Sequence, residues 1–277
     1  MPRPTLSVTL CNYNHGRYLP KCFAGLLRQT WTDFEILVTD DGSTDGSQQI
    51  IAEFAAKDQR FKPVYLPVNR GAMASAAQTL ERVQGELIFG HAADDFIVEA
   101  TFFERAVTSL QEHPQAAGFF AVTGLLSDER NVVYATMGTA PQEGFISPGE
   151  FFSGFIRNKI FVPGASSIWR HERLKEVGGY DYALGPQIDF LVNHLLPTKH
   201  GVVFSRTPMT CQRTFDNGSN YGSKGGTLWD ATTRYQKIEL VLRGEGIPYP
   251  GMETDWTRWR AHWMIDAIKT TGVRLAP

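Results

Sequence analysis

Cysteines, long apolar runs and charge imbalance are scarce in this sequence, and each scarcity excludes a class of protein. Three cysteines among 277 residues cannot all pair and show no metal-ligand spacing, so we expect free thiols in a reducing cytoplasm. No apolar run approaches the roughly 20 residues of a membrane-spanning helix. The first residues also lack the apolar core of a signal peptide, which favours a cytoplasmic protein.

Overall composition narrows the class further. The chain carries 27 Lys and Arg against 29 Asp and Glu, and this near balance gives no support for nucleic acid as a partner. An apolar fraction of 42% is too high for intrinsic disorder, and average usage of Gly and Pro excludes collagen-like and low-complexity chains. The length allows one large domain, or one domain plus an extension.

Apolar runs and helical periodicities alternate along the first 125 residues. This order favours a parallel sheet with right-handed crossovers, an α/β fold. Strands are predicted at Leu6–Leu10, Phe34–Thr39, Phe61–Leu66, Glu86–Gly90 and Ala117–Thr123, and helices at Tyr18–Arg28, Ser47–Asp58, Ala72–Val83 and Thr101–Glu112.

The pattern is looser after residue 125. Helices are predicted at Ser147–Ile156, Glu172–Val177 and Asp189–Leu196, the last ending before Pro197, and strands at Gly164–Trp169 and Val202–Phe204. Cys211–Gly226, rich in Asn, Gly and Ser, predicts a mobile loop, and two more helices are expected near Leu228–Arg243 and Asp255–Thr270.

Polar segments follow three of the predicted strands. They contain Asn12, Tyr13 and Asn14, then Asp40 and Asp41, then Asp94 and Asp95. The carboxyl ends of parallel strands share one sheet edge, where ligands bind, so the three segments should surround one crevice.

Each acidic pair has two interpretations. Asp40 and Asp41 follow apolar sequence and need a partner, such as a ring N–H or a ribose hydroxyl, and a turn or helix cap is the alternative. Asp94 and Asp95 suit a hard divalent cation that also binds phosphate, and a solvated turn is the alternative.

The order of these motifs resembles that of family 2 glycosyltransferases. The resemblance lies in LSVTLCNYNHGRYLPKCFAGLLRQTWTDFEILVTDDGSTDGS, then VNRGA, GELIFGHAADD and GASSIWRHERLKEVGGYD, over about residues 5–205. It implies the GT-A fold, a Rossmann-like three-layer α/β/α arrangement with a mostly parallel sheet, plus a helical C-terminal extension. We expect a GT-A domain over residues 1–205, with nucleotide-binding and acceptor halves at about 1–124 and 125–205, and a flexible loop and helical extension over 206–277.

The resemblance also assigns roles to the nucleotide-binding segments. It places Tyr13 and Asn14, next to Asn12, in the nucleotide pocket, and Asp41 at the base with Asp40 beside it. The DxD motif of the family binds ribose and metal, and its last Asp matches Asp94, followed by Asp95, whereas Ala92 stands at its first position. The implied cofactor is Mg²⁺ or Mn²⁺.

Further matches concern phosphate binding and proton transfer. The family often carries a phosphate-contacting arginine after the segment that ends at Gly71, and this chain lacks it, so Arg70 is the candidate substitute. Arg213 matches another arginine of the family, which reaches the diphosphate. Gln187 falls at the position of the general base, so Asp189, two residues on, is the candidate, and a helix-start acid is the alternative.

A third signal is a Trp-rich face at the C-terminus. Trp256, Trp259 and Trp263 lie at helical spacing, with basic residues beside them. Packing on the catalytic domain or on a second copy in a homodimer is the favoured interpretation. Docking on a membrane surface is the alternative, which would make the protein peripheral to a membrane.

These inferences give one leading hypothesis and two rivals. The leading hypothesis is an inverting, metal-dependent glycosyltransferase that moves a sugar from a UDP-, dTDP- or GDP-linked donor to a sugar or lipid-linked acceptor. The family's common setting is synthesis of bacterial surface polysaccharide or glycoconjugates. A catalytically weak nucleotide-sugar-binding protein of the same fold is the first rival, and a sugar-1-phosphate nucleotidyltransferase is the second.

Overall fold

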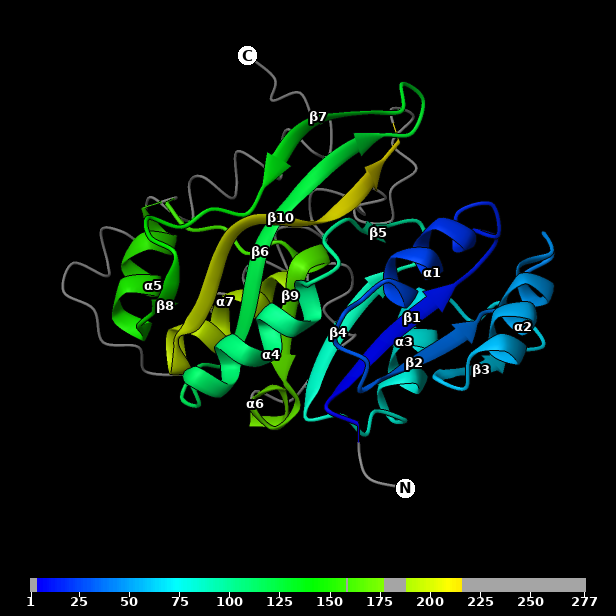
Figure 1. Ribbon diagram of the computed structural model, residues 1–277, viewed down its shortest axis with the longest axis horizontal. Coiled ribbons are helices and arrows are strands. Elements are labelled where there is room, and N and C mark those ends of the chain that lie inside the picture. The colour runs from blue at the N-terminus through cyan, green and yellow to red at the C-terminus, as the bar shows by residue number, and fades with distance from the viewer. Residues whose placement is uncertain (1–3, 158, 177–187, 216–277) are drawn as a thin grey trace, which may run out of the picture.

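The computed structural model describes residues 4–157, 159–176 and 188–215. Its described strands form one sheet in the order β3-β2-β1-β4-β9-β6-β10-β5, with β7 paired to β6 and β8 to β10 (Figure 1). The strands are β1 (Leu6–Asn12), β2 (Phe34–Asp40), β3 (Phe61–Tyr65), β4 (Leu87–Ala92), β5 (Phe96–Ile97), β6 (Gly118–Ser127), β7 (Val132–Met137), β8 (Gly144–Ile146), β9 (Ser167–Arg170) and β10 (Val202–Thr214). The helices are α1 (Leu19–Leu27), α2 (Ser47–Lys57), α3 (Ala72–Leu80), α4 (Phe102–Glu112), α5 (Pro148–Ile156), α6 (His171–Glu176) and α7 (Ile188–His200), with a 3₁₀ turn, η1, at Gly164–Ser166.

The first four long strands are all parallel. β1 pairs with β2 and with β4, and β2 pairs with β3, as the strand-helix alternation predicts. Every residue of β2 is buried, including Glu35, whose carboxylate accepts hydrogen bonds from Ser7 Oγ (2.6 Å) and Lys62 Nζ (2.6 Å). A continuous apolar run in the sequence therefore forms a strand covered on both faces.

One antiparallel strand separates this half from the rest. β9 runs antiparallel to both β4 and β6, so β6 points the same way as β4, and β10 is parallel to β6. The carboxyl ends of β1, β2, β4, β6 and β10 therefore lie along one edge of the sheet.

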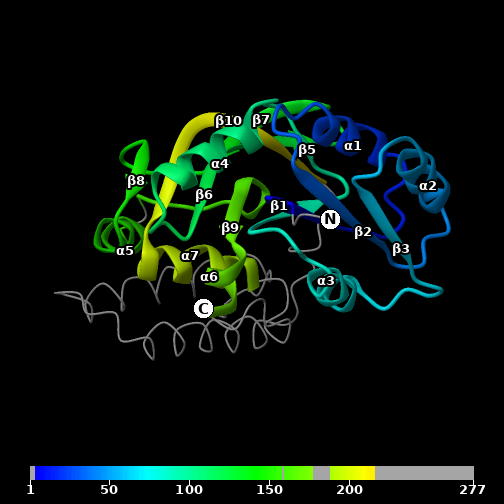
Figure 2. The same ribbon diagram turned by 60° about the horizontal axis from the view of Figure 1, so that its bottom comes forward.

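Helices cover both faces of the sheet. Figure 2 shows α1, α2 and α4 on one side, and α3, α6 and α7 on the other. One apolar cluster lies on the first side, around Phe23, Phe89 and Phe102, and a second lies on the other, around Phe120, Trp169 and Leu196. This is the three-layer α/β/α arrangement that the resemblance implies, and the sheet is mixed because of β5, β7, β8 and β9.

The structure corrects the prediction that helix α7 ends before Pro197. The helix continues to His200, although Pro197 cannot donate a backbone hydrogen bond. Val192, Leu195 and Leu196 are buried in the second apolar cluster, and the hydroxyl of Thr198 donates to the carbonyl of Leu195 (2.7 Å). Packing of the buried face therefore outweighs the lost helix bond.

The last described strand is longer than predicted. The sequence indicates a strand at Val202–Phe204 and a loop from Cys211, but β10 continues to Thr214, paired with β6. Register shifts at Ser205, Pro208 and Thr210 bend the strand and accommodate its proline. β10 crosses the expected boundary at residue 205, so we propose that the catalytic unit extends at least to Thr214.

Other differences are smaller. η1 occupies the first half of the strand predicted at Gly164–Trp169, and β5, β7 and β8 were not predicted. Gln187, the rest of the Cys211–Gly226 segment after Phe215, and the two C-terminal helices with Trp256, Trp259 and Trp263 lie outside the described residues. Within the described part, no helix has the length and apolar character needed to cross a membrane.

A close approach between β6 and β9 gives a test of this packing. A Cβ on Gly118 would lie 2.4 Å from both the carbonyl oxygen of Ile168 and the indole ring of Trp169. We expect Gly118→Ala to lower the free energy of unfolding by about 2–3 kcal/mol through overpacking. Gly149, in the first turn of α5, has nothing within 4 Å of the same position. Gly149→Ala should instead stabilise the fold by about 0.5 kcal/mol, and urea denaturation of both variants measures the contrast.

Candidate active site

A cavity of about 820 Å³ opens at the edge where the strand carboxyl ends meet. This volume lies in the range of small-molecule binding sites. Its lining comes from the loops after β1, β2, β4 and β6, the start of α3 and the end of β10: Cys11, Asn12, Tyr13, Asn14, His15, Arg17, Tyr18, Asp41, Asn69, Gly71, Ala72, Ser75, Ala92, Asp94, Asp95, Asp128, Glu129, Gln212, Arg213 and Phe215. The sequence prediction that three acidic or amide segments surround one crevice is therefore consistent with the geometry.

Asp40 lies behind the wall of this cavity. Its carboxylate is fully buried and accepts hydrogen bonds from Asn12 Nδ2 (2.7 Å), Ser43 Oγ (2.7 Å), the Ser43 amide (2.9 Å) and Gln48 Nε2 (2.9 Å). We expected a ligand N–H or hydroxyl to pair with Asp40, but the protein supplies all four donors. Its role is to hold the loop after β2 against the end of β1.

Asp41 faces the cavity and is also fixed by the backbone. Its two carboxylate oxygens accept the amides of Arg70 (2.7 Å) and Gly71 (2.9 Å). The turn that follows Asp41 requires a glycine at position 42. Gly42 has a φ of +71°, and a Cβ there would lie 2.6 Å from the Val68 carbonyl carbon. Arg70 contributes its backbone here; its residue is exposed and does not line the cavity.

Two buried polar atoms in the lining have no partner within the part of the chain that the structure describes. They are Asn12 Oδ1, whose residue is 1% exposed, and Ser75 Oγ, whose residue is fully buried. Burying such groups without a hydrogen bond costs free energy, so each is a site at which a bound ligand would gain a hydrogen bond. Asn12 is among the nucleotide-binding residues predicted from the sequence, whereas Ser75 is not, because only burial in the fold singles it out.

Asp94 and Asp95 are neighbours with different surroundings. The side chain of Asp94 is 16% exposed and lies in the cavity, with Oδ1 4.0 Å from His15 Nδ1. Asp95 is 5% exposed and accepts the Arg213 amide (2.8 Å). Burial raises the pKa of the Asp95 carboxyl well above its usual range, the charge of Asp94 raises it further, and Arg213 opposes both. Asp94 is therefore the carboxylate better placed for a cation.

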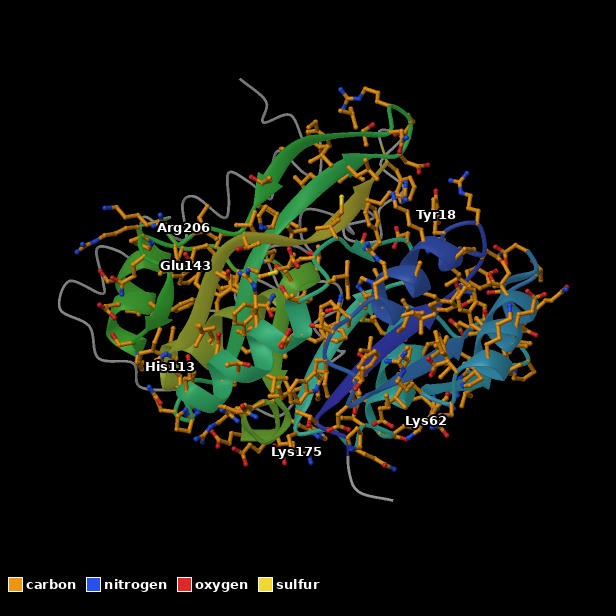
Figure 3. The ribbon with its side chains drawn as sticks, in the orientation of Figure 1. Tyr18, Lys62, His113, Glu143, Lys175 and Arg206 are labelled. Atoms are coloured by element: carbon orange, nitrogen blue, oxygen red, sulfur yellow. The ribbon has the colours of Figure 1, made fainter. Side chains whose placement is uncertain are left out.

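Arg213 connects several parts of the rim. Its guanidinium donates to the Asp94 carbonyl (3.1 Å) and to Asp128 Oδ1 (2.6 Å), and it lies 4.5 Å from the ring centre of Tyr18. Arg17 lies over the same ring and pairs with Asp128 at 3.2 Å. Figure 3 shows Tyr18 between α1 and the tips of β6 and β10.

Sequence reasoning missed Tyr18 and Asp128 as members of the site, whereas Arg17 belongs to the basic residues near the N-terminus that suggested a phosphate-bearing ligand, with a solvated face as the alternative. Asp128 Oδ2 accepts the Tyr18 hydroxyl at 3.0 Å, across 110 positions of the chain. No motif surrounds Asp128, and the β6–β7 hairpin that presents it was not predicted. Its pairing with Arg213 depends on the parallel register of β6 and β10, which local sequence patterns do not reveal.

Asp189 lies apart from the described cavity lining. It is exposed in the first turn of α7, and its Oδ2 lies 3.0 Å from where a Cβ on Gly164 would be. Continuing the β4–β9 register beyond Phe89 and Ile168 places η1 level with the end of β4. Asp189 is thus at the same edge of the sheet as Asp94, and its role as a base stays a prediction.

The fold and the site define a class before any family is considered: a three-layer α/β protein with an acidic cavity at the carboxyl edge of its sheet. Comparison with solved structures agrees on the fold. TarS from S. aureus (residues 1–349, with UDP-GlcNAc) matches with a TM-score of 0.69 at 17% identity, covering 86% of this chain and 66% of that one. The mannosyltransferase PcManGT from Pyrobaculum calidifontis, with GDP-Man and Mn²⁺, matches at 0.59 and 14% identity, covering 100% and 77%.

The sequence comparison identifies the family. The model of glycosyl transferase family 2 matches residues 7–170, and the chain belongs to this family. An uncharacterized glycosyltransferase of Haemophilus influenzae is 34% identical over 113 residues, 41% of this chain and 45% of that protein. TuaG of Bacillus subtilis, whose name assigns it to teichuronic acid biosynthesis, is 33% identical over 93 residues, 34% and 37% of the two chains. The chain spans about half the length, or less, of these curated relatives.

The contacts of Arg213 lead to a prediction for Asp128→Asn. The substitution removes a carboxylate charge that pairs with the buried guanidinium at 2.6 Å, so we expect unfolding to become easier by about 1–3 kcal/mol and the Kd for UDP to rise about tenfold. Chemical denaturation and calorimetry measure the two effects.

The matched control is Asp58→Asn, which breaks the Arg60–Asp58 pair (2.7 Å) between α2 and β3. It should leave UDP affinity within twofold of the original. Equal UDP affinity in Asp128→Asn and the unmodified protein would show that Asp128 makes no contribution to UDP binding.

Proposed function

We propose that the protein transfers a sugar, with inversion, from a nucleotide-diphosphate donor to an acceptor hydroxyl. The observation that carries this is the single cavity shared by the carboxyl ends of β1, β2, β4, β6 and β10, with Asp41 and Asp94 on one rim and Arg213 beside them. Membership of glycosyl transferase family 2 supports the reaction class.

The nucleoside fits the end of the cavity formed by β1 and α3. Among the described residues, Asn12 Oδ1 and Ser75 Oγ have no hydrogen-bond partner there, and Asp41 presents a carboxylate fixed by two backbone amides. Carboxylate and amide oxygens accept hydrogen bonds from base N–H and ribose O–H groups. Tyr13 and Asn14, in the loop after β1, line this end of the cavity. A nucleotide-sugar donor is supported by the structural neighbours, which are complexes with UDP-GlcNAc and GDP-Man.

The diphosphate fits in the part of the cavity that is lined by Asp94, Arg17 and Arg213. Arg213 and Arg17 supply positive charge, and Arg is suited to phosphate because its N–H groups form a planar fork. Among the described residues no group of three His, Cys, Asp or Glu side chains is arranged to hold a metal. A cation bound by one or two protein ligands, the diphosphate and water fits this donor set, and it would neutralise charge on the leaving diphosphate.

Asp189 is our proposed general base. Its carboxylate would take the proton of the acceptor hydroxyl as the oxygen forms its bond to the anomeric carbon. The bond from that carbon to the diphosphate oxygen breaks on the opposite face, which inverts the configuration. The acceptors in this proposal are sugars or lipid-linked glycans of bacterial surface polysaccharide synthesis, with which the name of TuaG agrees.

The Asp94 carboxylate provides a test of the metal role. Asp94→Asn should lower the rate of nucleoside diphosphate release from a donor at least 100-fold, because the leaving group loses electrostatic stabilisation. EDTA should have the same effect on the unmodified protein, and Mn²⁺ or Mg²⁺ should restore the rate. Asp33→Asn, at the opposite end of β2, is the control. Unchanged release in Asp94→Asn would refute the metal role.

Asp189→Asn tests the base. We expect transfer to fall by a factor of about 100 or more while UDP affinity stays within twofold, since Asp189 is outside the described donor cavity. Glu172→Gln is the matched control, because Glu172 is an exposed acid in the first turn of α6. Normal transfer in Asp189→Asn would mean that another group accepts the proton.

Donor binding with no product from any acceptor, in the unmodified chain, would favour a nucleotide-sugar-binding protein.

A further inference from the structure

His15 is the one imidazole in the described cavity lining, and the function proposed above gives it no role. The loop that carries it is held on both sides. The Asn14 amide donates to Ser43 Oγ (2.9 Å), and the Gly16 amide donates to Asp45 Oδ2 (2.8 Å). Asn14 itself has a φ of +54°, and its side-chain oxygen accepts the Thr44 amide (2.8 Å). The position of His15 is therefore set by the loop after β2 before any ligand binds.

The ring of His15 is also oriented. It meets the Tyr18 ring edge-on, with centroids 5.7 Å apart at 83°, and Tyr18 is in turn fixed by Asp128. In this orientation His15 Nδ1 lies 4.0 Å from Asp94 Oδ1, and the imidazole side chain stays 40% exposed.

The separation of these two atoms is informative. It is too long for a hydrogen bond, and a pair this exposed contributes little as a salt bridge. Two donors that share one cation, each about 2.1 Å from it, lie roughly 3 to 4 Å apart. The distance from Nδ1 to Oδ1 is thus compatible with a metal between them.

Asp95 does not compete for this role. Its Oδ1 accepts the Arg213 amide and its residue is 5% exposed, so Asp94 is the carboxylate directed at the cavity. Asp41, the other carboxylate in the nucleoside part of the lining, has both oxygens bound by backbone amides. His15 is a lining side chain with a ring nitrogen, and that nitrogen lies 4.0 Å from Asp94 Oδ1.

We propose that His15 Nδ1 is the second protein ligand, with Asp94, of the divalent cation that accompanies the donor diphosphate. This rests on the metal role in the proposed function and adds the ligand that sets metal preference. Mn²⁺ accepts an imidazole nitrogen beside its oxygen ligands, whereas Mg²⁺ binds through carboxylate, phosphate and water oxygens. The site therefore favours Mn²⁺ over Mg²⁺, and removing His15 reduces that preference.

Pulsed electron paramagnetic resonance of Mn²⁺ tests the ligand without any turnover. The full chain is frozen with Mn²⁺ and UDP, and nitrogen-14 modulation from a bound imidazole is measured. The test variant is His15→Phe, which keeps a ring against Tyr18. The matched control is His113→Phe, since His113 stacks on Phe145 far from Tyr18 (Figure 3). Thermal denaturation checks that each variant is folded.

We expect the nitrogen signal in the unmodified protein and in His113→Phe, and its loss in His15→Phe. The Kd for Mn²⁺ in the presence of UDP should rise at least about tenfold in His15→Phe. Losing a residue that only hydrogen-bonds to a metal ligand already weakens metal affinity by this factor. The Kd for Mg²⁺ should change less, so the ratio between the two metals falls.

Two results would overturn the proposal in distinguishable ways. If Mn²⁺ and UDP bind together but no nitrogen signal is seen, or if it persists in His15→Phe, the ligand assignment is wrong and the proposed function stands. If Mn²⁺ does not bind to the complex of the unmodified chain with UDP, the metal role in the proposed function is wrong as well.

Discussion

The site depends on one buried charge, the guanidinium of Arg213. It pairs with Asp128 at the end of β6, donates to the carbonyl of Asp94 after β4, and lies over the ring of Tyr18 next to α1. Its own amide holds Asp95. Because a buried guanidinium without a partner is costly, these contacts fix the distance between the two halves of the sheet. The cavity has its shape because one side chain needs partners from three different elements.

Burial gives the four acids that follow β2 and β4 different roles. Asp40 is covered by side-chain and backbone donors and supports the loop after β2, whereas Asp41 combines backbone support with access to the cavity. Asp95 lies under the rim with a pKa raised by burial. Asp94, one residue earlier, extends into the cavity. Similar side chains therefore support the loops or face the cavity, according to how deeply each is buried.

The N-terminal half of the described fold was predictable because its signals are local. Apolar runs such as β2, and turn residues such as Gly42, mark strands and their ends within a few positions. The second half was less predictable. Its strands β6, β9 and β10 are adjacent only through pairings between distant segments, and bulges let β10 accommodate Pro208. In α7, burial of Leu195 and Leu196 outweighed the effect of Pro197 on the helix.

The sequence by itself determined that acids and amides follow β1, β2 and β4, and parallel strands bring those ends to one edge of a sheet. Each of these strands and the polar residues after it can be predicted from a pattern within a few positions of the sequence. Only the tertiary structure decided that Asp40 turns away from the cavity, that Asp128 joins Arg213, and that His15 approaches Asp94. Those outcomes depend on burial and on contacts between residues 28 to 85 positions apart, which no local pattern encodes.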